Sequence, residues 1–183
     1  MKILKLPRDA TVDDLYELDE KAEIVNGEIV LMTPTGFLPH RAALNVTFHL
    51  RALEAARSGF AIGDGAAFVV DLPQRKSFSP GAAWYAGEPT GGRFMDGAPV
   101  FAVEVRSEGD YGLRAEREMM AKRAEYFAAG TAVVWDVDVL REEVIRVYRA
   151  TEPDTPVIYH RGETAEAEPA VRGWRFLVDN LWL

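Results

Sequence analysis

The chain has 183 residues, is 48% hydrophobic and 27% charged, carries a formal net charge of −8 and contains no cysteine. These values indicate one globular domain, residues 1–183, and they exclude disulfides, thiolate metal sites and general charge-driven binding to nucleic acid, although a local basic site stays open. No apolar run is long enough to span a membrane, and the lack of cysteine fits a cytoplasmic protein.

The first half of the chain is predicted to contain two helices and several strands. A Thr followed by two Asp predicts a short helix over residues 11–18. Asn26-Gly27 between two apolar runs predicts a hairpin over residues 22–32. A longer helix is predicted over residues 39–57. A three-stranded meander is predicted to follow, over residues 60–62, 66–71 and 78–85.

The second half is predicted to begin with a buried strand over residues 99–107. A helix over residues 113–129, which stops before a Gly, and a strand over residues 132–137 follow. Strand, helix and strand in this order predict a crossover between parallel strands. The remaining segments are an antiparallel strand over 143–149 at the sheet edge, a short strand over 157–159, a loop over 162–169, and apolar segments over 174–178 and 181–183 that dock on the body.

Glu104 is the candidate functional residue of the buried strand. Side chains alternate along a strand, so Phe101 and Val103 share one face while Glu104 and Arg106 share the other. A glutamate in so apolar a run is costly to bury unless it is paired or binds a cation. Glu104 is therefore either a site carboxylate or a strand-end residue that reaches solvent or pairs with an arginine.

Three more residues carry two readings each. Lys122 lies beside the apolar stripe of its helix. Either its aliphatic stem covers apolar surface while its ammonium reaches water, or its ammonium points toward Glu104. Glu23 lies on the first arm of the hairpin and is by default a charge at a strand edge. His40, in the first turn of the long helix, is by default a surface residue, since three histidines without paired spacing do not predict a zinc site.

The ordered motifs resemble a known family. They are Glu-Ile-Val-Asn-Gly in the hairpin, Thr-Pro-Thr-Gly, a helix that opens with His, Ser-Pro-x-Ala-Ala-Trp, Val-Phe-Ala-Val-Glu-Val-Arg-Ser and Lys-Arg-Ala-Glu-Tyr-Phe-Ala-Ala-Gly. Over residues 15–148 the chain resembles the Uma-type family of bacterial proteins described as endonucleases. That family is a branch of the PD-(D/E)xK restriction-endonuclease-like superfamily.

The resemblance implies an α/β (α+β) fold, a restriction-endonuclease-like mixed sheet flanked by helices. It also implies hydrolysis of a phosphodiester in nucleic acid, with DNA the expected substrate and Mg²⁺ the expected cofactor. Carried over residue by residue, the site comprises Glu104, Glu23, His40, Lys122 and Arg106, with Glu104 and Glu23 as metal ligands. Arg106 stands where the motif has lysine; it can hold a phosphate but is a poor general base.

Gly81 is the main departure from the family pattern, because it stands where the metal-binding aspartate of the PD element is expected. Asp71 on the preceding strand is a weaker substitute. Two functions follow: a Mg²⁺-dependent endonuclease, or a catalytically impaired member that binds or scaffolds. The resemblance also allows a homodimer. Gly81 is expected to limit the protein, and Gly81→Asp is expected to restore cation binding. If Gly81 uses a positive φ, the aspartate should also be tolerated and the variant should fold.

Overall fold

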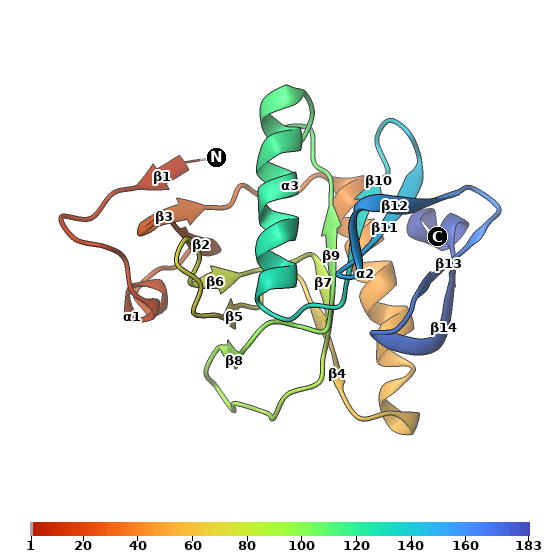
Figure 1. Cartoon of the computed structure of the whole chain (residues 1–183), viewed down its shortest axis with the longest axis horizontal. Coiled ribbons are helices and arrows are strands. Elements are labelled where there is room, and N and C mark those ends of the chain that lie inside the picture. The colour runs from red at the N-terminus through yellow and green to blue at the C-terminus, as the bar shows by residue number, and fades with distance from the viewer. Residues whose placement is uncertain (1) are drawn as a thin grey trace.

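The computed structural model describes residues 2–183, and a six-stranded mixed sheet forms its centre (Figure 1). The strands of this sheet are β4 (Phe60–Gly63), β7 (Ala82–Tyr85), β9 (Phe101–Val105), β10 (Val133–Asp138), β11 (Val144–Arg149) and β12 (Glu152–His160). Their order is β12-β11-β10-β9-β7-β4. Strands β9 and β10 run parallel, and the other neighbours run antiparallel. The expected mixed sheet is confirmed, although β12, and not β11, forms its edge.

Two long helices cover opposite faces of the sheet. Helix α2 (Phe37–Arg51) packs Val46 and Leu50 into one core with Val103 of β9. Helix α3 (Leu113–Ala128), green in Figure 1, packs Tyr126 into a second core with the next residue of β9, Ala102. Because side chains alternate along β9, Glu104 lies on the α3 face. The predicted strand, helix and parallel strand are confirmed.

The N-terminal elements form a small sheet on the side of the molecule away from the C-terminus (Figure 1). They are β1 (Lys2–Leu4), α1 (Val12–Tyr16), β2 (Ala22–Val25) and β3 (Glu28–Leu31). The predicted hairpin is β2–β3, and Asn26 and Gly27 have φ values of 51° and 72°. Positive φ at both central residues is the conformation that makes Asn-Gly a hairpin signal. The hairpin holds Glu23 in a fixed register opposite Val30.

The predicted meander is wrong, because its segments divide between two sheets. Strands β5 (Phe68–Val69), β6 (Ser77–Phe78) and β8 (Met95–Asp96) form a separate small sheet. Strand β4 instead pairs directly with β7 in the main sheet. The segment predicted as one strand, 78–85, is interrupted around Pro80, which has no N–H for a ladder hydrogen bond.

The C-terminal segment packs on the α2 side of the main sheet. It contains β13 (Thr164–Ala167), β14 (Val171–Leu177) and the 3-10 helix η2 (Val178–Trp182), so the loop predicted over 162–169 is wrong. Trp174 stacks on Trp135 of β10 with ring centroids 5.2 Å apart. The helix predicted over 39–57 ends at Arg51, and a 3-10 helix, η1 (Glu54–Ala56), follows it. No helix within residues 2–183 combines the length and the apolar character needed to cross a membrane.

Candidate functional site

Lys122 lies between two carboxylates under helix α3. Its Nζ is 2.9 Å from Oε1 of Glu23 and 2.8 Å from Oε1 of Glu104. Glu23 comes from the N-terminal hairpin, Glu104 from the central strand and Lys122 from α3. The expected convergence of these three side chains is therefore present, and we call them the Glu–Lys–Glu cluster.

Glu23 is the buried end of the Glu–Lys–Glu cluster, and its side chain is 5% exposed. The backbone N–H of Ser79 donates to Oε1 at 2.8 Å, and Arg75 donates to Oε2 at 2.6 Å. Arg75 also pairs with Glu125 of α3. Both oxygens of Glu23 are therefore satisfied by fixed donors.

Glu104 is the open end of the Glu–Lys–Glu cluster, with a side chain that is 26% exposed. The Tyr126 hydroxyl donates to Oε1 at 2.7 Å, so this oxygen accepts from both Tyr126 and Lys122. The other oxygen, Oε2, accepts no hydrogen bond from the described residues 2–183. The free oxygen of Glu104 is the point at which the cluster can meet a ligand.

The charges fix the protonation states. Burial raises the pKa of Glu23, but Lys122 and Arg75 outweigh burial and lower this pKa to about 2. Burial lowers the pKa of Lys122, but Glu104 and Glu23 outweigh it and raise this pKa above its ordinary value. Burial, Glu104 and Glu23 together raise the pKa of Tyr126. At neutral pH Lys122 is therefore a cation and Tyr126 a hydrogen-bond donor, and neither is a general base.

Arg106 belongs to a neighbouring cluster. Its Nε and one terminal nitrogen each donate to Asp136 at 2.7 Å, and its outer edge pairs with Glu116 of α3. The hydrogen bonds from Arg106 to Asp136 are the first cause of a pKa raised well above the ordinary arginine value. Arg106 follows Glu104 in the sequence by two residues. Within residues 2–183 it makes no hydrogen bond or ion pair with the Glu–Lys–Glu cluster.

His40 is not brought into the cluster. It is exposed in the first turn of α2, and α2 covers the opposite face of the sheet from Glu104. Sequence reasoning missed two residues that do contact the cluster, Arg75 and Tyr126. Tyr126 could have been found, since it lies one helical turn after Lys122. Arg75 arrives from a loop, and no local pattern marks it.

Gly81 does not use a positive φ, so that expectation is wrong. Its N–H donates to the carbonyl of Val103 at 3.0 Å, while Ala82 is the strand partner of the same residue. Two residues opposite one are the mark of a β-bulge, which redirects a side chain. A Cβ at Gly81 would lie 3.3 Å from Cβ of Ala43 and 3.7 Å from Cγ2 of Val105.

An aspartate at position 81 would therefore start toward α2, on the face of the sheet opposite Glu104. This geometry argues against the expectation that Gly81→Asp restores a cation site. The contact of 3.3 Å between the added Cβ and Cβ of Ala43 is also tighter than ordinary van der Waals contact, so a neighbour would have to shift. We now expect Gly81→Asp to gain no cation binding.

The donor set of the Glu–Lys–Glu cluster does not fit a Mg²⁺ ion. Mg²⁺ is bound through carboxylates with several retained waters in octahedral geometry. Both oxygens of Glu23 and one of Glu104 are already neutralised by Lys122, Arg75 and their neighbours. Within residues 2–183 no three His, Asp or Glu side chains are grouped as a metal site requires.

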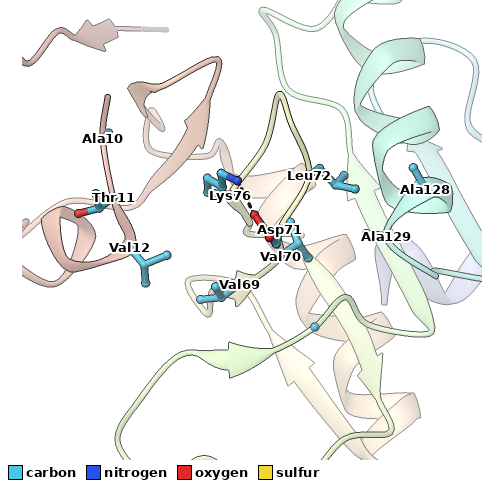
Figure 2. A pocket seen from close by; sticks show the side chains of 11 residues that line it. Ala10, Thr11, Val12, Val69, Val70, Asp71, Leu72, Lys76, Ala128 and Ala129 are labelled. Atoms are coloured by element: carbon cyan, nitrogen blue, oxygen red, sulfur yellow. Dashed lines mark hydrogen bonds and ion pairs between the residues drawn. The ribbon is translucent and has the colours of Figure 1, made fainter. Parts of the chain in front are cut away.

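A separate hollow of about 700 Å³ lies between the N-terminal segment, the end of β5 and the end of α3 (Figure 2). It is lined by Ala10, Thr11, Val12, Val69, Val70, Asp71, Leu72, Lys76, Gly97, Ala128 and Ala129. Asp71 pairs there with Lys76, as Figure 2 shows, and its side chain is 96% exposed. None of the five predicted site residues lines this hollow, and Asp71 does not stand in for the missing aspartate.

Comparison with known proteins gives a family and a fold. The sequence model of Uma2, described as "Putative restriction endonuclease", matches residues 10–179. A similar solved structure is that of "a putative nuclease belonging to DUF820" from Anabaena variabilis ATCC 29413, with a TM-score of 0.72 and 15% identity. The similarity covers 94% of this chain and 97% of that chain. No curated protein matches the chain significantly.

Proposed function

Because the chain belongs to the Uma2 family of restriction-endonuclease-like proteins, we propose that it binds nucleic acid, with DNA the expected ligand, at the surface around Glu104. We further propose that its site, as built, does not support Mg²⁺-dependent cleavage. The observation that carries this second part is the position of Lys122, whose ammonium lies within 2.9 Å of both carboxylates that would hold an ion.

The existing ion pairs support this reading. Lys122 contacts both Glu23 and Glu104, and Arg75 contacts Glu23 and Glu125, so both carboxylates of the Glu–Lys–Glu cluster already have a cationic partner. A divalent ion entering here would have to displace a lysine whose pKa the same carboxylates raise. The family pattern has a metal-binding aspartate at the position of Gly81. A side chain at this position would start toward α2, on the face of the sheet opposite Glu104.

The second candidate is the Mg²⁺-dependent endonuclease that the family resemblance suggests. The partly exposed Glu104, with a free Oε2 next to a protonated lysine, favours it. Both candidates share nucleic acid as the partner, and they differ in whether the phosphodiester is cut. In either case the net charge of −8 requires a local cationic surface for the phosphates.

We expect labelled duplex and single-stranded DNA to bind the protein with an affinity that falls steeply with salt. We also expect supercoiled plasmid in millimolar Mg²⁺ or Mn²⁺ to be nicked no faster by wild type than by Glu104→Gln. Fluorescence anisotropy and agarose gels measure these two quantities. Absence of binding to DNA and to an RNA of the same length would refute the proposal. Metal-dependent nicking that Glu104→Gln abolishes would establish the endonuclease instead.

Two further expectations stay predictions. A homodimer would present two sites to the two strands of a duplex, and sedimentation velocity of the purified chain measures it. A cytoplasmic location is checked by cell fractionation.

A further inference from the structure

Arg106 is held in place by a buried carboxylate of the neighbouring strand. Asp136, on the neighbouring parallel strand β10, is the register partner of Glu104, and its side chain is 3% exposed. Two hydrogen bonds of 2.7 Å join Asp136 to the Nε edge of the Arg106 guanidinium. This two-point contact fixes the plane of the guanidinium and presents its other edge toward helix α3.

The outer edge of Arg106 is covered by a carboxylate at the surface. Glu116, in the first turns of α3, accepts from both terminal nitrogens of Arg106. The side chain of Glu116 is 51% exposed, whereas that of Arg106 is 5% exposed. Because Glu116 reaches solvent, it can leave Arg106 without burying its own charge. An anion with two suitably spaced oxygens, such as phosphate, can then accept hydrogen bonds from the same two nitrogens of Arg106.

Two more arginines lie near the carboxylates that hold Arg106. Arg146 lies opposite Asp136 in the β10–β11 register, and Arg123 contacts Tyr148, which follows Arg146 by two residues on the same face of β11. The hydrogen bonds from Arg106 lower the pKa of Glu116, and the charges on Arg146 and Arg123 lower it further. Arg123 lies two helical turns after Glu116, with its guanidinium stacked 3.6 Å from the ring centroid of Tyr148. Stacking on this ring holds the cation in place.

Arg146 has a buried hydrogen-bond donor that is not paired within residues 2–183. It lies opposite Asp136 in the β10–β11 register and is 9% exposed. One terminal nitrogen pairs with Glu142. The other, Nη1, is buried, lies 4.0 Å from Asp136 and has no hydrogen-bond acceptor among residues 2–183. A buried donor without a partner is destabilising, so an acceptor that reached it would be favoured.

We propose that Arg106, Arg123 and Arg146 form a phosphate-binding site beside Glu104, and that Glu116 occupies this site in the free protein. The inference rests on the proposed function, because the ligand it commits to is a backbone phosphate of bound nucleic acid. Arg106 follows Glu104 by two residues and points to the same face of the sheet, so the phosphate would bind on the face of the sheet that carries Glu104. Displacement of Glu116 raises the local charge by one unit and exposes a cationic edge for the phosphate.

The test compares the DNA affinity of the variant Glu116→Gln with that of the variant Glu118→Gln. The control is matched, because Glu118 lies on the same helix, pairs with Arg114 and has a side chain that is 50% exposed. Both variants change the net charge equally, so a general charge effect cancels. We expect Glu116→Gln to tighten binding of labelled DNA about three- to tenfold more than Glu118→Gln does, a difference of up to about 1.4 kcal/mol. Arg123→Ala in the Glu116→Gln background should remove the gain.

Titration with inorganic phosphate separates the sources of the ligand. If wild type binds DNA but the two glutamine variants behave alike, the phosphate site is refuted and the proposed function stands. If no variant binds DNA but Glu116→Gln binds inorganic phosphate more tightly than Glu118→Gln, the proposed function fails and the phosphate site stands for a small ligand. If Glu116→Gln gains affinity for DNA and the gain survives Arg123→Ala, the assignment of Arg123 is overturned.

Discussion

Replacement of Lys122 by methionine is expected to lower the free energy of unfolding by about 3–5 kcal/mol. The reason is that Lys122 is the shared partner of Glu23, whose side chain is 5% exposed, and of Glu104. Methionine keeps most of the length of the lysine side chain and removes its charge. The loss of unfolding free energy therefore reflects the unpaired carboxylates more than lost packing. Urea denaturation of both proteins at neutral pH measures the difference.

Lys76→Met is the matched control for this prediction. Lys76 also pairs with a carboxylate, Asp71, but their side chains are 39% and 96% exposed. An exposed pair contributes about 0–1 kcal/mol, so this variant should unfold close to wild type. Equal, small losses in both variants would contradict the buried character of the Glu–Lys–Glu cluster and return Lys122 to an ordinary surface residue.

Acid is expected to remove about 3 kcal/mol of stability through Glu23 alone. The pKa of Glu23 is about 2 in the folded protein, against an ordinary value of 4.5. A carboxyl whose pKa is lowered by folding contributes its stability above the unfolded pKa and loses it as the pH falls toward the folded one. The contribution is therefore complete above about pH 5 and fades as the pH falls toward about pH 2.

Glu23→Gln isolates this contribution, because its side chain does not titrate. The free energy of unfolding of wild type should exceed that of Glu23→Gln at neutral pH, and the gap should close on acidification. Urea midpoints at a series of pH values give the gap, and other acids cancel in the difference. A gap that stays constant down to the lowest pH would mean that Glu23 has an ordinary pKa, and hence no buried cation partners.

Local patterns predicted much of the fold, because each depends on one element. Asn-Gly gave the β2–β3 hairpin through the positive φ of two residues. Alternation along β9 placed Glu104 on the strand face opposite Val103, and helical spacing placed Lys122 beside the apolar stripe of α3. In the structure these two side chains meet. These predictions succeeded because side-chain direction follows from backbone periodicity.

The failures concern relations between distant segments. The meander was mispredicted because strand partners are chosen by tertiary packing, and β5 and β6 joined a second sheet. The pairing of Arg75 with Glu23 joins residues 52 positions apart, and no local spacing marks it. The bulge that turns Gly81 toward α2 depends on the register of β7 against β9, which the composition of either strand leaves open.

The position of Lys122 is the central claim, and titration of Mn²⁺ into the purified wild-type protein tests it most directly. Mn²⁺ takes the same oxygen ligands as Mg²⁺, and its binding is followed by calorimetry or by electron paramagnetic resonance. Because the ammonium of Lys122 already contacts both Glu23 and Glu104, we expect wild type to bind no more Mn²⁺ than Glu104→Gln across the millimolar range. One-to-one binding by wild type that Glu104→Gln abolishes would contradict the account.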